Sequence, residues 1–117
     1  MRPRRTAARA SSSGLQVAAA VLALGFGAAA APAAAKVHTI VIEKMRFGPA
    51  PAGLRAGDTI VWVNKDPFRH TATARDKSFN LDLPPRTSGK TVVRRAGAVP
   101  FFCVFHPAMK GVLQVAR

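Results

Sequence analysis

The 117-residue chain contains a single cysteine, so it forms no internal disulfide. It also has no tyrosine and only five acidic residues, against 18 lysines and arginines. Small exported domains usually depend on disulfides, because a short chain buries too little apolar surface to be stable. No window shows a sustained 3.6-residue hydrophobic period, which argues against a helical fold. A disulfide-rich module and a helical bundle are therefore both excluded.

The first 35 residues have the composition of an export signal. Four arginines, at positions 2, 4, 5 and 9, precede an uncharged apolar stretch over residues 15–31. Small residues at 33–35 then provide a cleavage site, and the apolar stretch is short for a spanning helix. We therefore predict a signal peptide over residues 1–35, export to the bacterial periplasm or envelope, and a mature domain over residues 36–117. The alternative is a retained membrane anchor.

The predicted mature domain of 82 residues is strongly basic. It holds 14 basic and five acidic residues, a net charge of +9. A charge of this size acts on association with other molecules rather than on the fold. Export and the scattered placement of the basic residues argue against nucleic acid as the partner. We expect a protein partner with an acidic docking face, or at most peripheral contact with an anionic membrane surface.

Short β-rich segments separated by turn residues make up the mature domain. Strands are predicted at 37–45, 59–64, 70–74, 90–95, 99–104 and 111–116, with a weaker extended segment at 50–55. The segment 76–85 is polar and contains prolines, so it is expected to be a loop. This all-β pattern is typical of an antiparallel sandwich or barrel.

A soft-ligand set stands near the C-terminus. Cys103, His106 and Met109 lie within seven residues of one another, and His70 is the best candidate for a second imidazole. A trigonal His₂Cys site with a weak axial Met is the ligand set of a blue-copper electron-transfer centre. Zinc is the rival metal, but structural zinc usually takes four Cys or His ligands, and the thioether of Met109 favours copper.

Residues beside the predicted ligands have supporting roles. A ligating histidine needs its other ring nitrogen fixed by a partner. Asn64 and Thr71 lie near His70 in sequence and are candidates for hydrogen bonds at the site. An apolar collar around His106 is the predicted docking surface, formed by Phe68, Pro107 and Ala108.

These residues resemble the cupredoxins, and most closely the amicyanin/plastocyanin-like branch. The matching motifs are Gly57-Asp58-Thr59-Ile60-Val61-Trp62-Val63-Asn64, His70-Thr71 and Cys103-x-x-His106-Pro107-x-Met109-x-Gly111. The resemblance implies a Greek-key β-sandwich of about seven to eight strands, one type 1 copper ion and single-electron transfer through His106. Val104-Phe105 stands where amicyanins tend to have a proline before the histidine, so the same docking partner is not implied.

The combined prediction is an exported copper protein that carries single electrons between redox partners. It is not expected to be an enzyme, because the ligand set leaves no evident open position and no His-x-His pairs suggest a multicopper cluster. The alternative is a copper-handling protein that stores or delivers the ion. The sequence also allows a second copper site at Lys36-Val37-His38. Cleavage after Ala35 would give a free amine, two backbone amides and an imidazole, which together can enclose Cu(II) in a square plane.

Overall fold

The structure, a computed structural model, describes residues 34–117 without a break, together with residues 3, 14, 20, 25 and 27. The predicted signal peptide therefore lies almost entirely outside the described residues. The part of the chain that is described contains no helix long and apolar enough to cross a membrane.

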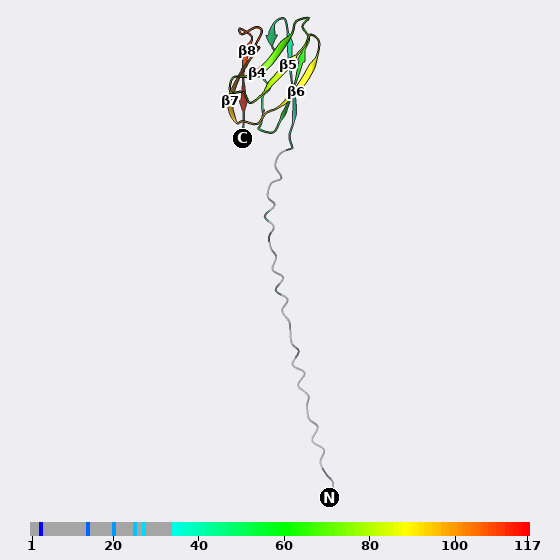
Figure 1. Cartoon of the computed structure of the whole chain (residues 1–117). Coiled ribbons are helices and arrows are strands. Elements are labelled where there is room, and N and C mark those ends of the chain that lie inside the picture. The colour runs from blue at the N-terminus through cyan, green and yellow to red at the C-terminus, as the bar shows by residue number, and fades with distance from the viewer. Residues whose placement is uncertain (1–2, 4–13, 15–19, 21–24, 26, 28–33) are drawn as a thin grey trace. The chain divides into compact units, whose positions relative to one another are not determined.

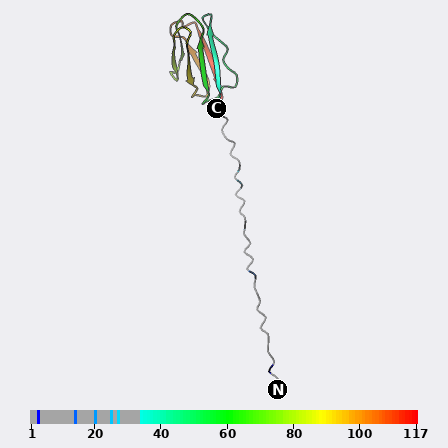
Figure 2. The same ribbon diagram turned by 90° about the vertical axis from the view of Figure 1, so that its right-hand side faces the viewer.

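Over residues 34–117, eight strands form two four-stranded sheets packed face to face (Figures 1 and 2). The strands are β1 (Val37–Glu43), β2 (Arg46–Phe47), β3 (Thr59–Asn64), β4 (His70–Ala74), β5 (Asn80–Leu83), β6 (Ser88–Val92), β7 (Gly97–Phe102) and β8 (Lys110–Val115). The first sheet has the order β2-β1-β3-β6 and the second β5-β4-β7-β8. The predicted all-β sandwich of seven to eight strands is confirmed.

Two connections meet at one end of this sandwich. The loop 65–69 carries the chain from β3 in the first sheet to β4 in the second, and the loop 103–109 joins β7 to β8. Strands β4 and β7 are antiparallel neighbours, with Thr73 opposite Phe102. The start of β4 therefore lies beside the end of β7, which brings His70 and Cys103 to the same edge.

The core lies between the sheets and is centred on aromatic rings. The ring of Trp62 lies 5.2 Å from that of Phe101 and 5.8 Å from that of Phe79, measured between centroids. Trp62 Nε1 donates to Thr91 Oγ1 at 2.8 Å, which satisfies the buried indole. A Cβ atom at Gly111 would come within 2.5 Å of the Phe101 ring, so only glycine fits there.

Several details of the strand prediction are wrong, and the short strand β2 was not predicted. The expected loop at 76–85 contains β5, in which Leu83 points into the core while Asn80 and Asp82 are exposed; flanking turn residues hid this alternation. The segment 50–55 is not a strand, and only the bridge Arg55–Ala116 forms there. Strands β1 and β3 pair in parallel, so the sandwich is not purely antiparallel.

Candidate metal centre

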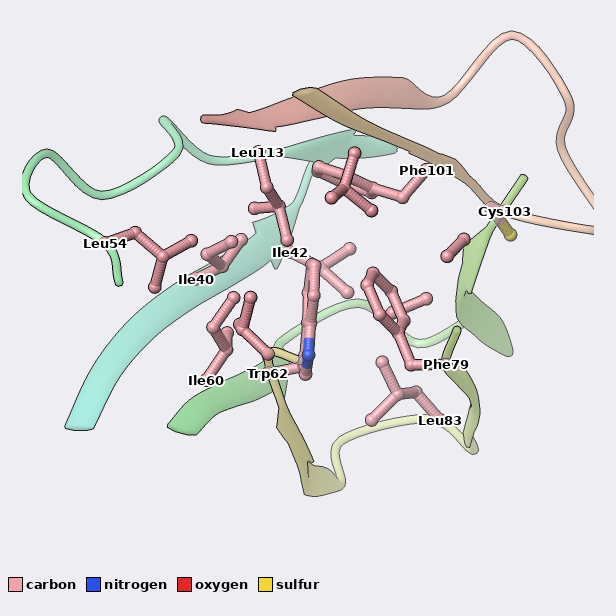
Figure 3. Close-up of a cluster of buried hydrophobic side chains, with 14 of the residues drawn as sticks. Ile40, Ile42, Leu54, Ile60, Trp62, Phe79, Leu83, Phe101, Cys103 and Leu113 are labelled. Carbon is pink, nitrogen blue, oxygen red and sulfur yellow. The ribbon is translucent and has the colours of Figure 1, made fainter. Parts of the chain in front are cut away.

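Three predicted ligands converge at the end of the sandwich. Cys103 Sγ lies 3.8 Å from His70 Nδ1 and 3.7 Å from His106 Nδ1. The donor atoms all lie within 4.8 Å of one another, and the two imidazole rings are 5.2 Å apart. Cys103 and His70 are completely buried, whereas His106 is partly exposed. Figure 3 shows Cys103 at one end of the buried cluster, far from Leu54.

The loop 103–109 is folded tightly by its own backbone. His106 N–H donates to the carbonyl of Cys103 at 3.3 Å, and Met109 N–H donates to the carbonyl of His106 at 2.8 Å. Cys103 N–H in turn donates to the carbonyl of Met109 at 3.0 Å, which closes the loop. The spacing Cys-x-x-His-x-x-Met therefore corresponds to one ring of backbone hydrogen bonds, which places the His106 imidazole beside the thiol.

Asp66 fixes the orientation of the His70 ring. Its Oδ2 atom lies 2.8 Å from His70 Nε2, and it also accepts hydrogen bonds from the amides of Lys44 and Met45. Burial alone would raise the pKa of Asp66, but the hydrogen bonds from His70, Met45 and Lys44 outweigh it and lower the pKa. The ionised carboxylate therefore accepts the Nε2 proton and leaves the Nδ1 lone pair directed toward the thiol.

Sequence analysis missed Asp66. A signal was present, because Asp66 is the only carboxylate close to His70 in sequence, four residues before it. Metal-ligating histidines commonly donate their second ring nitrogen to a carboxylate. The distance could not be read from the sequence, since residues 65–69 form an irregular loop with no fixed periodicity.

Thr71 contacts the thiol through its backbone. Thr71 N–H lies 3.4 Å from Cys103 Sγ and donates to it. The Thr71 hydroxyl accepts from the amide of Val104 at 2.9 Å, which ties β4 to the loop after Cys103. The backbone and side chain of Thr71 therefore fix the position of the sulfur relative to β4.

Asn64 supports the site from one layer further away. Its Nδ2 atom donates to the carbonyls of Phe68, Leu83 and Pro84, and its Oδ1 atom accepts from Asp66 N–H at 2.9 Å. Within the described region these bonds go to the loop 65–69 and to the end of β5 rather than to the ligands themselves. Asn64 therefore holds the loop that carries Asp66 and leads into His70.

Met109 and two of the three predicted docking residues, Pro107 and Ala108, line a groove beside His106. Met109 is buried, with 6% of its surface exposed. An open groove beside His106 has a volume of about 570 Å³ and is lined by Met45, Arg46, Phe105, His106, Pro107, Ala108 and Met109. Phe68 is 54% exposed but does not line this groove. The groove wall includes Met45 and Arg46, which sequence analysis did not identify.

The donor set fits a copper ion. A trigonal ion with bonds of about 2.3 Å to sulfur and about 2.0 Å to nitrogen would hold those atoms about 3.7 Å apart. The distances from Cys103 Sγ to the two imidazole nitrogens are 3.7 and 3.8 Å. A thiol is a soft donor that favours copper, imidazole also suits copper, and the thioether of Met109 belongs to the same loop as Cys103.

The family of the chain follows from sequence comparison. A sequence model of the cupredoxin-like domain matches residues 16–115. The chain belongs to the cupredoxin family. Copper is the cofactor of this cupredoxin, consistent with the cluster of one cysteine and two histidines.

Two known proteins are similar to this chain in sequence. The methylamine utilization protein MauL of Methylorubrum extorquens is 33% identical over 106 residues, which cover 87% of this chain and 93% of the relative. The amicyanin of Paracoccus versutus is 27% identical over 89 residues, covering 71% of this chain and 67% of the relative. The predicted amicyanin-like resemblance is confirmed.

Solved structures support the same fold. The crystal structure of Paracoccus versutus amicyanin superposes with a TM-score of 0.57 at 26% identity, covering 74% of this chain and 85% of that one. A copper-containing nitrite reductase from Thermus scotoductus gives a TM-score of 0.60 at 24% identity. The match covers 68% of this chain but only 22% of the reductase, so that likeness concerns the fold alone.

His38 lies outside the metal cluster and is bound to Asp58. His38 Nε2 is 2.9 Å from Asp58 Oδ2, and Lys36 N–H donates to Asp58 Oδ1 at 2.9 Å. The amide of Lys36, then His38 and the amide of Arg55, lower the pKa of Asp58 to about 2. A square-planar Cu(II) site would need Lys36-Val37-His38 to turn back on itself, whereas this segment enters the extended strand β1. The fold therefore opposes the second copper site.

Proposed function

We propose that this cupredoxin is a one-electron carrier whose copper is bound by His70, Cys103, His106 and Met109. The supporting observation is the convergence of one buried sulfur and two imidazole nitrogens at separations that suit a trigonal ion. When bound, copper supplies the Cu(II)/Cu(I) couple, which accepts one electron from a donor and passes one to an acceptor. We do not propose an enzymatic activity.

The protein side of this function is to keep the ligands in one geometry. His70 is held by Asp66, the sulfur receives the Thr71 amide, and the loop 103–109 is closed by backbone hydrogen bonds. These contacts come from strand β4 and from two separate loops, so the ligands have little freedom to move when the charge on the metal changes. Small movement means small reorganisation, which suits fast electron transfer.

Copper titration followed by optical spectroscopy tests the ligand set. The loaded protein should bind one copper per chain and absorb strongly near about 600 nm, as expected for copper–thiolate bonding. Cys103→Ser should abolish this band, and His38→Ala should retain it with the same stoichiometry. A band that persists in Cys103→Ser would refute the proposal. If the wild type binds a second copper ion that His38→Ala does not bind, the N-terminal site at Lys36-Val37-His38 exists after all.

A copper-handling role predicts different behaviour. A carrier keeps copper in both oxidation states and cycles reversibly in voltammetry, whereas a delivery protein should release Cu(I) to a competing chelator. The burial of Cys103 and His70, both without exposed surface, supports retention. Rapid transfer of Cu(I) from the protein to a competing chelator would favour the delivery role.

We propose that the partner is a redox protein with an acidic face. All five acidic residues lie in the described part, and four are already engaged by hydrogen bonds or ion pairs: Asp58, Asp66, Asp76 and Asp82. Arg46 lines the apolar groove beside His106. Lys110 is exposed and follows Met109, another groove residue, in the sequence. An apolar patch with a cationic border complements an apolar patch with an acidic border.

Charge reversal tests this docking surface. Lys110→Glu should slow electron exchange with acidic redox proteins, and added salt should slow exchange with the wild type, because steering is screened beyond about 8 Å at physiological ionic strength. Arg94→Glu is the matched control, since Arg94 precedes β7 at the end opposite Cys103. Equal effects of the two reversals would contradict a local docking face, and strong binding to anionic vesicles alone would indicate a membrane role.

Export and cleavage after Ala35 form the last part of the proposal. Lys36 N lies 2.9 Å from the buried Asp58 carboxylate, so cleavage at this bond would place a positive α-amino group directly on that anion. Mass spectrometry of protein from the periplasmic fraction would identify the natural N-terminus. A mature chain that begins at Ala34, or an uncleaved chain in the membrane fraction, would contradict it.

A further inference from the structure

The turn between β1 and β2 is strained. Lys44 and Met45 occupy its two central positions with φ angles of 54° and 60°, and the flanking residues Glu43 and Arg46 pair across it. Such two-residue hairpin turns need positive φ at both positions, for which glycine, asparagine and aspartate are preferred. Lysine and methionine are disfavoured there. The surrounding structure must therefore hold the turn in place.

The Asp66 carboxylate provides that restraint. Asp66 Oδ1 accepts from Lys44 N–H at 2.8 Å, and Oδ2 accepts from Met45 N–H at 3.0 Å. The same Oδ2 atom lies 2.8 Å from His70 Nε2. One carboxylate, only 7% exposed, thus joins both amides of the turn to the ring of a predicted copper ligand.

The turn is also part of the groove beside His106. Met45 and Arg46 form one wall, and residues 105–109 form the other. An apolar side chain of an acidic partner would fit against Met45, and a neighbouring carboxylate would pair with Arg46. A partner seated in this groove therefore contacts a strained turn whose amides share an acceptor with His70.

We propose that Asp66 is a positioning residue that couples the groove wall to the copper ligand His70. This inference rests on the proposed electron-carrier function. When the turn amides move away, the Asp66 carboxylate accepts fewer hydrogen bonds. It then accepts the remaining hydrogen bond, from His70 Nε2–H, more strongly. The imidazole then becomes a stronger donor, stabilises Cu(II) relative to Cu(I) and lowers the reduction potential. By linkage, the occupant of the groove binds the oxidised and reduced forms with different affinities.

Variants of Lys44 test the coupling, because Lys44 is exposed and does not line the groove. Lys44→Pro removes the amide donor and cannot adopt positive φ, whereas Lys44→Gly keeps the donor and favours positive φ. Lys44→Val keeps the amide but strains the turn, and serves if the proline variant fails to fold. Each is made in the wild type and in the Asp66→Asn background.

Two readouts are compared. In the copper protein, Lys44→Pro or Lys44→Val should shift the Cu(II)/Cu(I) affinity ratio about threefold or more toward Cu(II) relative to Lys44→Gly. In the copper-free protein, the ¹⁵N shifts of the His70 ring should change in the same variants. Both differences should disappear in the Asp66→Asn background, because the shared acceptor has lost its charge.

Several outcomes would overturn the coupling. Identical potentials and His70 shifts in the glycine, valine and proline variants would show that the turn does not act on the ligand. Differences that persist unchanged in Asp66→Asn would show that they do not pass through Asp66. If the His70 shifts respond as expected while the wild type shows no copper–thiolate band, the coupling stands and the electron-carrier proposal fails.

Discussion

Replacement of Asn64 by alanine should loosen the loop that carries Asp66. The Asn64 side chain is 1% exposed, and its two amide hydrogens serve carbonyls at 2.8, 3.0 and 3.2 Å while its oxygen accepts from Asp66 N–H. Counting about three full hydrogen bonds at roughly 1 kcal/mol each gives a loss of about 3 kcal/mol in the free energy of unfolding. For a domain of this size the loss corresponds to a decrease of roughly 10–20 °C in Tm.

Chemical and thermal unfolding of the copper-free protein would measure this loss. Asn80→Ala is the matched control, because Asn80 is exposed and its Oδ1 accepts one hydrogen bond from Thr73. The control should change stability by less than about 0.5 kcal/mol. In the copper protein, Asn64→Ala should also broaden the thiolate band, since His70 loses part of its support. A loss below about 1 kcal/mol with an unchanged band would refute this account of Asn64.

Three further predictions concern stability. Thr91→Val should lower the free energy of unfolding by about 1–3 kcal/mol in denaturant titrations, because the buried Trp62 N–H loses its acceptor; a neutral effect would contradict this. Asp58, with its pKa lowered from 3.8 to about 2, should contribute stability that is complete above about pH 4 and is lost as the pH falls toward 2. Asp58→Asn should therefore flatten that part of the acid-stability curve, and parallel curves would exclude the effect. Copper removal should lower Tm in calorimetry, because the metal joins the start of β4 to the loop 103–109; equal Tm values with and without copper would show that it does not stabilise the fold.

The strands with clear alternation were predictable, and the others were not. Residues 59–64 form β3 as predicted, because Ile60, Trp62 and Asn64 are buried while the intervening residues are only partly buried. Strand β5 was missed because its four residues stand between a polar turn and two prolines, so the local signal for a loop exceeded the signal for a strand. Its position is fixed by antiparallel pairing with β4, from His70–Leu83 to Thr73–Asn80.

The sequence by itself determined the chemistry of the site. A lone cysteine, with a histidine three residues on and a methionine six residues on, defines a soft-ligand loop, and His38 was the only rival to His70. The spacing acts locally, since the loop 103–109 is closed by its own backbone hydrogen bonds. These features require no knowledge of distant contacts, so a reading along the chain can recover them.

Only the tertiary structure decided which residues support the ligands. Asp66, Met45 and Arg46 reach the site because the loop 65–69 and the turn after β1 meet at one end of the sandwich, although about 20 residues separate them in the chain. The same packing excluded His38 by joining it to Asp58 at a separate position. Hydrogen-bond partners across loops depend on the register and crossing of strands, which are set by the packing of the whole core rather than by any local pattern.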